Sequence, residues 1–195
     1  MLKLIGNVKS RTFRVLWMLE ELGLDYEHQS QMPRSDEVRA LNPLGKIPVL
    51  IDGDAILTDS SAILTYLADK HHKLTFPAGT LDRAKQDSHT FFVLDELDAC
   101  LWTAARHSFV LPEEQRVPAV KDTLRWEFER SQKHFADRLG DGPWLMGDIF
   151  TIPDIIAAHC GGWAINAQFP VTEPAFRDYI DRARDRPAFQ RAAAK

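Results

Sequence analysis

Two short motifs near each other in the sequence could together bind an extended, peptide-like ligand with a carboxylate. In the first, Asn42 to Leu50, Pro48 stands where a buried strand should begin, a position that suits a residue without an N–H. The Ile47–Pro48 bond is a candidate for the cis isomer, which leaves the N–H and C=O of Ile47 free to pair with another group. The second motif, Asp59-Ser60, opens a helix, and the free N–H groups of a helix start attract an anion.

Both motifs also have a structural interpretation. The proline can form a rigid turn into the strand, and Asp59 or Ser60 can be the N-cap of the helix, because a short polar side chain accepts from the first free N–H groups. Thr151 and Asp154 have the spacing of a capping box, in which each side chain bonds the other residue's backbone N–H. We expect this pair to stabilise a buried helix and to have no part in an active site.

Residues 1–75 alternate strand and helix patterns that would position these motifs. Apolar residues recur at helical spacing from Val15 to Leu22, and Gly23 ends that helix. Further helices are predicted over residues 35–41 and 60–70, and strands over residues 2–5, 25–29, 47–51 and 55–58. The order βαβαββα, with a hairpin between the last two strands, predicts a mixed sheet with helices packed on it.

The composition changes after a linker-like segment at residues 72–80. No convincing strand pattern follows. The sequence predicts helices over residues 82–106, 112–139, 152–167 and 173–183, with a last one after Pro187. We therefore expect an α/β domain over residues 1–75 and a C-terminal helical bundle domain over residues 80–195.

Composition and charge argue against several classes of partner. The net charge of −4 over 195 residues gives no reason to expect nucleic-acid binding. The uncharged stretch at 155–171 is shorter than a membrane span needs, and the N-terminal apolar segment is too short for a signal peptide. Cys100, Cys160 and the seven histidines match no metal spacing, so we expect no metal and a reducing, cytoplasmic setting.

A βαβαββα unit with a proline before its third strand resembles the thioredoxin fold. With the helical second half, the chain is similar to the cytosolic glutathione transferases. Residues 15–27, 42–50 and 59–63 and the Thr151–Asp154 box carry the resemblance over nearly the whole chain. The resemblance implies a thioredoxin-like N-terminal domain, glutathione as co-substrate and a homodimer.

The resemblance also implies roles for the two motifs. The backbone of Ile47, before Pro48, would pair with the cysteinyl part of glutathione, as an added strand does. Ser60 would bind the γ-glutamyl carboxylate with its hydroxyl and N–H, and Asp59 would help bind the ammonium of the same residue. Lys46 could meet the glycyl carboxylate or be a solvated loop lysine.

Catalysis in this family requires a glutathione thiolate, and the sequence departs from its relatives at this point. The loop at residues 6–12 contains no Tyr and no Cys, so a mixed-disulfide mechanism is not expected. We favour Ser10 as the hydroxyl donor to the thiolate, with an N-cap role for the same residue as the structural alternative. Lys9, Asn7 and Thr12 are the other candidates in this loop.

A second-substrate pocket is predicted where the helix at 82–106 ends. Trp102 and Phe109 could form its apolar wall, although aromatic residues at helical spacing are more often core. Arg106 and His107 could bind an acidic co-substrate.

The expected reaction is attack of the glutathione thiolate on an electrophilic carbon of a small apolar or aromatic substrate. The sequence does not identify that electrophile. Two alternatives remain: a glutathione-dependent peroxidase or disulfide reductase that uses no protein cysteine, and a non-catalytic glutathione-binding or scaffold protein.

Overall fold

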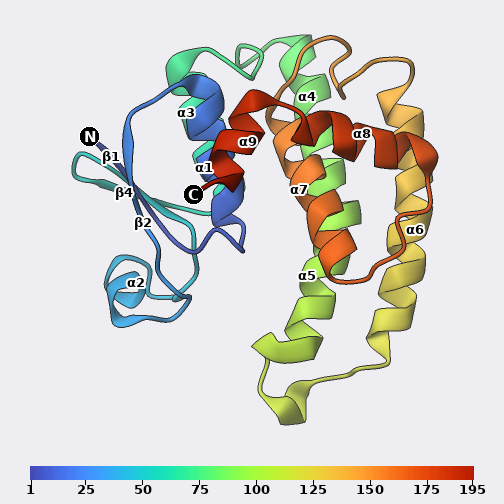
Figure 1. The fold of residues 1–195 in the computed structure, drawn as a ribbon, viewed down its shortest axis with the longest axis horizontal. Helices are drawn as coiled ribbons and strands as arrows, with labels where there is room; N and C mark the ends of the chain where they lie inside the picture. The colour runs from blue at the N-terminus through green and yellow to red at the C-terminus, as the bar shows by residue number, and fades with distance from the viewer. The chain divides into compact units, whose positions relative to one another are not determined.

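The computed structural model describes all residues from 1 to 195, and the chain folds into two compact units (Figure 1). Unit 1 consists of residues Met1–Pro77 and Arg184–Lys195, and unit 2 of residues Ala78–Ala183. We expected the second domain to extend from residue 80 to residue 195. In the structure, the last twelve of these residues, 184–195, cluster with the first unit instead.

Unit 1 is built on a four-stranded mixed sheet in the order β2-β1-β3-β4. Strand β1 (Leu2–Ile5) pairs parallel to β2 (Tyr26–Gln29) and antiparallel to β3 (Val49–Asp52), which pairs antiparallel to β4 (Ala55–Thr58). The helix between β1 and β2 is the crossover that a parallel pair requires. The element order β1, α1, β2, α2, β3, β4, α3 confirms the predicted βαβαββα arrangement.

The helices of unit 1 are α1 (Thr12–Leu22), α2 (Asp36–Leu41) and α3 (Ser60–His71). Successive side chains of a strand point to opposite faces, so Leu4 and Leu50, which are opposite each other in the β1–β3 ladder, share one face. Ile5 and Val49 share the other face, where they cluster with Val38 of α2. Both faces of the central strands are therefore buried. This burial holds the strands in place, and with them the points at which the following loops begin.

The C-terminal helix α9 (Pro187–Ala193) joins unit 1 because it packs on α1 (Figure 1). The Phe189 ring lies 5.1 Å from the ring of Phe13 and 5.0 Å from that of Trp17, both in edge-on contacts. Arg186 donates two hydrogen bonds, of 2.6 and 2.8 Å, to the carboxylate of Glu21. Such bidentate pairs combine charge with fixed geometry. No periodicity in the sequence indicates the element on which α9 packs.

Unit 2 is helical, as predicted. A continuous helical segment comprises α4 (Leu81–Phe92), the π-helical η1 (Val93–Asp98), α5 (Ala99–Ala105) and the π-helical η2 (Arg106–Val110). The short η3 (Glu113–Gln115), α6 (Val120–Leu139), α7 (Ile152–Asn166) and α8 (Pro174–Arg184) follow. We expected the helix before residue 139 to start at Pro112; it starts at Val120, because Pro118 lacks an N–H and disfavours helical backbone in Val117.

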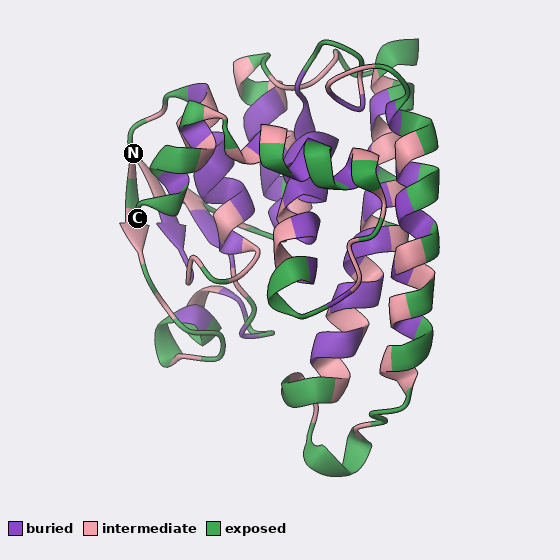
Figure 2. Cartoon of the chain, turned by 45° about the vertical axis from the view of Figure 1, so that its right-hand side comes forward, coloured by how far each residue is buried: buried purple, intermediate pink, exposed green.

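Burial follows the helical period in this unit. In Figure 2, buried positions line one side of α6 and exposed positions the other, and its buried residues include Leu124, Phe128 and Phe135. Helix α7 is buried over most of its length. None of the helices is both long enough and apolar enough to cross a lipid bilayer.

The capping box at the start of α7 is present. The carboxylate of the fully buried Asp154 accepts hydrogen bonds from the N–H of Thr151 (2.8 Å), the N–H of Leu145 (2.9 Å) and the hydroxyl of Tyr179 (2.8 Å). Burial raises the pKa of Asp154 to about 6, although these donors act in the opposite direction. Asp154 therefore joins three separate segments of unit 2.

Candidate functional site

The segment before β3 presents an unpaired stretch of backbone. The Ile47–Pro48 peptide bond is cis, as the motif predicts. Ile47 is half-buried, and neither its N–H nor its C=O forms a hydrogen bond within the chain. Asn42, buried at the start of this turn, donates to the carbonyl of Lys46 (2.9 Å) and fixes the conformation of the turn. An extended ligand could therefore pair with Ile47 as an added strand does.

Gly6, the residue after β1, brings the predicted catalytic loop beside Ile47. A Cβ atom on Gly6 would lie 2.2 Å from Oγ1 of Thr12 and 3.0 Å from Cβ of Ile47, and the φ angle of Gly6 is +143°. Only glycine fits such a close approach. Thr12 and Ile47, 35 positions apart in the chain, thus both lie against the place that a side chain of residue 6 would occupy.

The loop at residues 6–12 is fixed by its own hydrogen bonds. The Ser10 hydroxyl donates to the carbonyl of Asn7 (2.6 Å) and accepts from the N–H of Thr12 (3.1 Å). The Asn7 side chain accepts from the N–H of Lys9 (2.8 Å), while the Lys9 side chain is exposed. Ser10 is half-buried and Thr12 is fully buried. Of the four candidates, Ser10 combines a hydroxyl, partial exposure and a fixed position.

The start of α3 combines an N-cap with an unpaired backbone N–H. Asp59 has a φ of +70°, unusual for a residue with a side chain, and its Oδ1 accepts from the N–H groups of Ser61 (2.9 Å) and Ala62 (3.2 Å). Asp59 is therefore the N-cap that the structural interpretation predicts. The N–H of Ser60 has no partner within the chain, and Ser60 is the first residue of the helix.

Arg14 lies behind this helix start. Its side chain is fully buried in α1, and its Nη1 donates to the Ser60 hydroxyl at 3.5 Å. The Ser60 oxygen thus accepts from a guanidinium, and its hydrogen can be donated to an anion. Arg14 was not among the predicted site residues, and the available signal was a charged residue in an otherwise apolar helical stretch.

Arg34 is a second residue that sequence analysis missed. Its N–H donates to the carbonyl of Gly45 (2.8 Å), and its φ angle is +69°. A Cβ atom on Gly45 would lie 3.1 Å from Cγ of Arg34, so the side chain is next to the turn that carries Lys46. Both side chains are exposed and form no ion pair in the structure. Nothing in the local sequence indicates this pairing of two distant loops.

The residues predicted for a second-substrate pocket lie on unit 2. Trp102 and Arg106 are one helical turn apart, and Phe109 is 71% exposed. Arg106 forms no ion pair, and its buried Nε has no hydrogen-bond partner. His107 has another partner, because its Nδ1 accepts from the N–H of Val117 (3.1 Å). The structure therefore leaves Arg106 without an ion-pair partner, whereas the Nδ1 atom of His107 is engaged.

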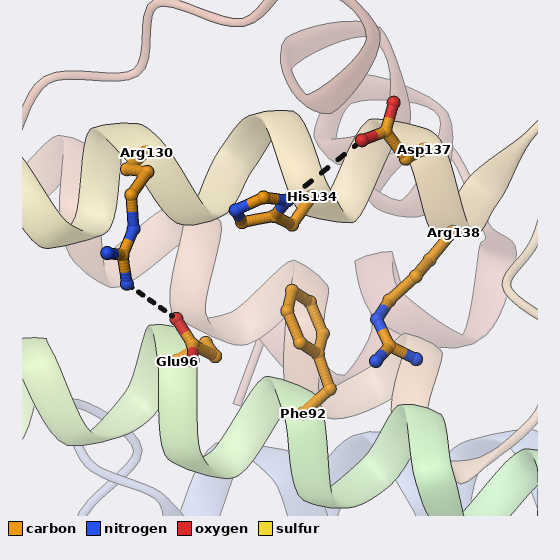
Figure 3. Close-up of a pocket in the computed structure, with 6 residues that line it drawn as sticks. All are labelled: Phe92, Glu96, Arg130, His134, Asp137 and Arg138. Atoms are coloured by element: carbon orange, nitrogen blue, oxygen red, sulfur yellow. Dashed lines mark ion pairs between the residues drawn. The ribbon is translucent and has the colours of Figure 1, made fainter.

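A hollow of about 480 Å³ lies elsewhere on unit 2, between the α4–η1 segment and α6 (Figure 3). Its charged side chains largely have partners: Arg130 lies 3.7 Å from Glu96, and His134 lies 4.0 Å from Asp137. The guanidinium of Arg138 is 4.4 Å from the centre of the Phe92 ring, the distance of a cation–π contact. No residue of this hollow was predicted as a site, and its lining contains no Ser, Thr, Cys or Lys.

Comparisons with known proteins agree with the motifs. The sequence profile described as "Glutathione S-transferase, N-terminal domain" matches residues 10–74. The glutathione S-transferase-like protein gedE of Aspergillus terreus is 31% identical over 163 residues, covering 73% of this chain and 69% of gedE. The disulfide-bond oxidoreductase YfcG of Escherichia coli is 28% identical, covering 93% of this chain and 89% of YfcG. For several other curated relatives the matched region is less than two thirds of the relative, down to 30%.

The fold comparison covers the whole chain. The crystal structure of glutathione transferase URE2P6 from Phanerochaete chrysosporium in complex with oxidized glutathione has a TM-score of 0.84 and 26% identity. The alignment covers 99% of this chain and 94% of that protein. Both the α/β unit and the helical unit therefore have counterparts in one known protein.

Proposed function

The chain belongs to the glutathione S-transferase family, and from this we propose that it binds glutathione on unit 1 and transfers its thiolate to a small electrophile. The observation that carries the proposal is the unpaired N–H and C=O of Ile47. Ile47 lies next to Gly6, which is also in close contact with Thr12. A cysteinyl residue paired with Ile47 would bring its sulfur to the loop that contains Ser10.

Charged and polar groups support binding of the two ends of glutathione. The γ-glutamyl carboxylate would accept from the N–H and hydroxyl of Ser60, with the buried Arg14 behind them. Oδ1 of Asp59 is engaged as the N-cap, so only its other oxygen would meet the ligand's ammonium. The glycyl carboxylate would be bound by Lys46, with Arg34 as a second cation.

Ser10 is the proposed donor to the thiolate. A free thiol has a pKa of about 8.5, and lowering it by two units requires about 2.7 kcal/mol of stabilisation of the anion. A hydroxyl donor and the positive end of α1 both favour the anion. Most of the catalysis would then come from thiolate formation and from positioning of the two substrates.

Ser60→Ala tests the binding site. We expect the substitution to weaken glutathione binding by about 1–3 kcal/mol in a calorimetric titration, because it removes a charge-assisted hydrogen bond. Ser61→Ala is the matched control, since its hydroxyl forms no hydrogen bond in the structure and only its backbone N–H contacts Asp59. Equal affinities of the two variants would contradict a ligand role for Ser60 and leave it a helix residue only.

The second substrate is proposed to bind on unit 2 at Trp102, Arg106 and Phe109. An aromatic electrophile with a carboxylate would satisfy both the aromatic side chains and the unpaired Arg106. We expect Arg106→Gln to lower kcat/KM at least about tenfold for a carboxylate-bearing aryl halide, while the neutral analogue changes less than about twofold. Equal losses for both substrates would contradict an anion-binding role of Arg106.

One relative favours a second reaction class. YfcG is named a disulfide-bond oxidoreductase and matches 93% of this chain, and Cys100 and Cys160 are both buried. A disulfide or peroxide reduction here would therefore use glutathione thiols only. Turnover of a small disulfide or an organic hydroperoxide, with none of an aryl halide, would select this reaction over conjugation. Glutathione binding with an unshifted thiol pKa would indicate a non-catalytic protein.

The oligomeric state and cell compartment are proposed from the family alone. We propose a homodimer in the cytoplasm. Sedimentation velocity would show a single dimeric species at micromolar concentration, whereas a stable monomer that still turns over substrate would contradict the dimer proposal.

A further inference from the structure

The first turn of α1 contacts two separate parts of the proposed glutathione site. The N–H of Phe13 donates to the carbonyl of Ser10 at 3.0 Å. Nη1 of the buried Arg14, the next residue, donates to the Ser60 hydroxyl at 3.5 Å. A shift of this turn would therefore displace the Ser10 loop and the group behind Ser60 at the same time.

The start of α1 has no side chain of its own that caps it from the N-cap position. Arg11 is at that position and makes no side-chain cap bond, because a guanidinium has no acceptor for the free N–H groups. The Ser10 oxygen accepts from the N–H of Thr12 at 3.1 Å, but this bond lies within the loop and the turn and moves with them. The position of the turn therefore depends on the residues against which its side chains pack.

The C-terminal helix α9 packs on this turn through the ring of Phe189. Its ring centre lies 5.1 Å from that of Phe13, with the two planes inclined by 69°, and 5.0 Å from that of Trp17, with an inclination of 86°. Edge-to-face contacts at these distances are favourable for aromatic rings. Phe13 and Trp17 are four residues apart and therefore lie on one face of α1. Phe189 thus contacts the first turn and the following turn of α1 together.

Charged contacts attach α9 to the other end of α1. Arg186 donates two hydrogen bonds to the carboxylate of Glu21, and Arg191 donates to the carboxylate of Glu20 at 2.8 Å and to its carbonyl at 2.9 Å. Glu20 and Glu21 are in the last turn of α1. The ion pairs therefore act at the end of α1 that is far from the proposed site, whereas Phe189 acts at the end next to it.

We infer that Phe189 is a positioning residue for the glutathione site. By packing on Phe13, it holds the first turn of α1 in the place where the turn supports both Ser10 and Ser60. The inference rests on the proposed function, in which Ser10 donates to the thiolate and Ser60 binds the γ-glutamyl carboxylate. A small displacement of a positioned donor is costly for catalysis, so a residue outside the site can change the pKa of the bound thiol.

Phe189→Ala tests the inference, because it removes the ring that contacts Phe13. In the complex saturated with glutathione, we expect the thiol pKa, followed by the ultraviolet absorbance of the thiolate, to rise by about half to one unit. The glutathione dissociation constant should rise at least about threefold. A loss of stability alone would leave this pKa unchanged, because only the folded complex contributes to the bound-thiol signal. Phe189→Leu keeps an apolar side chain against Phe13 and should bring the pKa back toward the wild-type value.

Arg191→Gln is the matched control on the same helix, since it removes a contact with the last turn of α1 and leaves Phe189 in place. Its bound-thiol pKa should equal that of wild type. Equal rises in Phe189→Ala and Arg191→Gln would overturn the specific role of Phe189. If the alanine variant does not fold, Phe189→Val, a smaller truncation, gives the same comparison.

The wild-type protein separates the inference from the proposed function. A lowered thiol pKa in wild type, together with the same pKa and affinity in Phe189→Ala, would overturn the inference alone. A wild-type complex whose thiol keeps the pKa of free glutathione would contradict the proposed function and, with it, the inference about Phe189.

Discussion

Replacing Asp154 with alanine is expected to lower the free energy of unfolding by about 3–5 kcal/mol, because it leaves several buried donors without an acceptor. The carboxylate accepts from the N–H groups of Leu145 and Thr151 and from the hydroxyl of Tyr179. These three residues lie before α7, at its N-cap and in α8. Loss of one side chain thus affects the start of α7 and its packing with α8 at the same time. Urea unfolding followed by tryptophan fluorescence would measure the change.

Asp148→Ala is the matched control, six residues away and exposed, and should change stability by less than about 0.5 kcal/mol. The pH dependence gives a second readout. The folded-state pKa of Asp154, about 6, lies above its ordinary value of 3.8. The part of its stabilising contribution that comes from this shift is therefore complete below pH 3.8 and is lost as pH rises through 6. The stability advantage of wild type over Asp154→Ala should therefore be about 1 kcal/mol larger at pH 5 than at pH 7.5. An equal stability advantage at both pH values would contradict the raised pKa of Asp154.

Replacing Gly6 with alanine is expected to disrupt the binding site and to lower the free energy of unfolding by about 3 kcal/mol. The new Cβ would lie 2.2 Å from Oγ1 of Thr12 and 3.0 Å from Cβ of Ile47. Both neighbours belong to the proposed glutathione site, so relief of the clash must move either the Ser10 loop or the Ile47 segment. We expect glutathione affinity to fall at least about tenfold in calorimetry.

Gly23→Ala separates this crowding from the effect of backbone conformation. Gly23 also has a positive φ, of 66°, but a Cβ there would meet nothing within 4 Å. We expect this variant to lose about 1 kcal/mol of stability and to bind glutathione like wild type. If Gly6→Ala lost no more stability and no more glutathione affinity than Gly23→Ala, the proposed close packing of Thr12 and Ile47 against Gly6 would be wrong.

The α/β unit could be predicted from the sequence because local signals agreed with each other. Gly23 ends α1 in the left-handed conformation that a glycine favours. The proline motif predicted both the start of β3 and the cis bond before Pro48. In unit 2, Pro112 and Pro118 are both compatible with a helix start, and periodicity could not decide that α6 begins at Val120.

Contacts between distant segments were not predictable in the same way. Packing of α9 on α1 depends on Phe189 and Arg186, neither of which has a local pattern. Ser10 was found as a candidate from its residue type, but its hydrogen-bond partners depend on the path of the backbone from Gly6 to Thr12. Arg14 and Arg34 acquire their place in the site through Ser60 and Gly45. Such pairings are set by the fold, so a single sequence indicates the residue types and not their partners.

Titration of the glutathione thiol in complex with the wild-type protein tests the central claim most directly. We expect glutathione to bind to a single site per chain. The pKa of its thiol should fall by about one to two units from the free value of about 8.5. A calorimetric titration would establish the binding, and ultraviolet absorbance of the thiolate would report the pKa. Absence of binding, or a bound thiol with the pKa of the free one, would contradict the account.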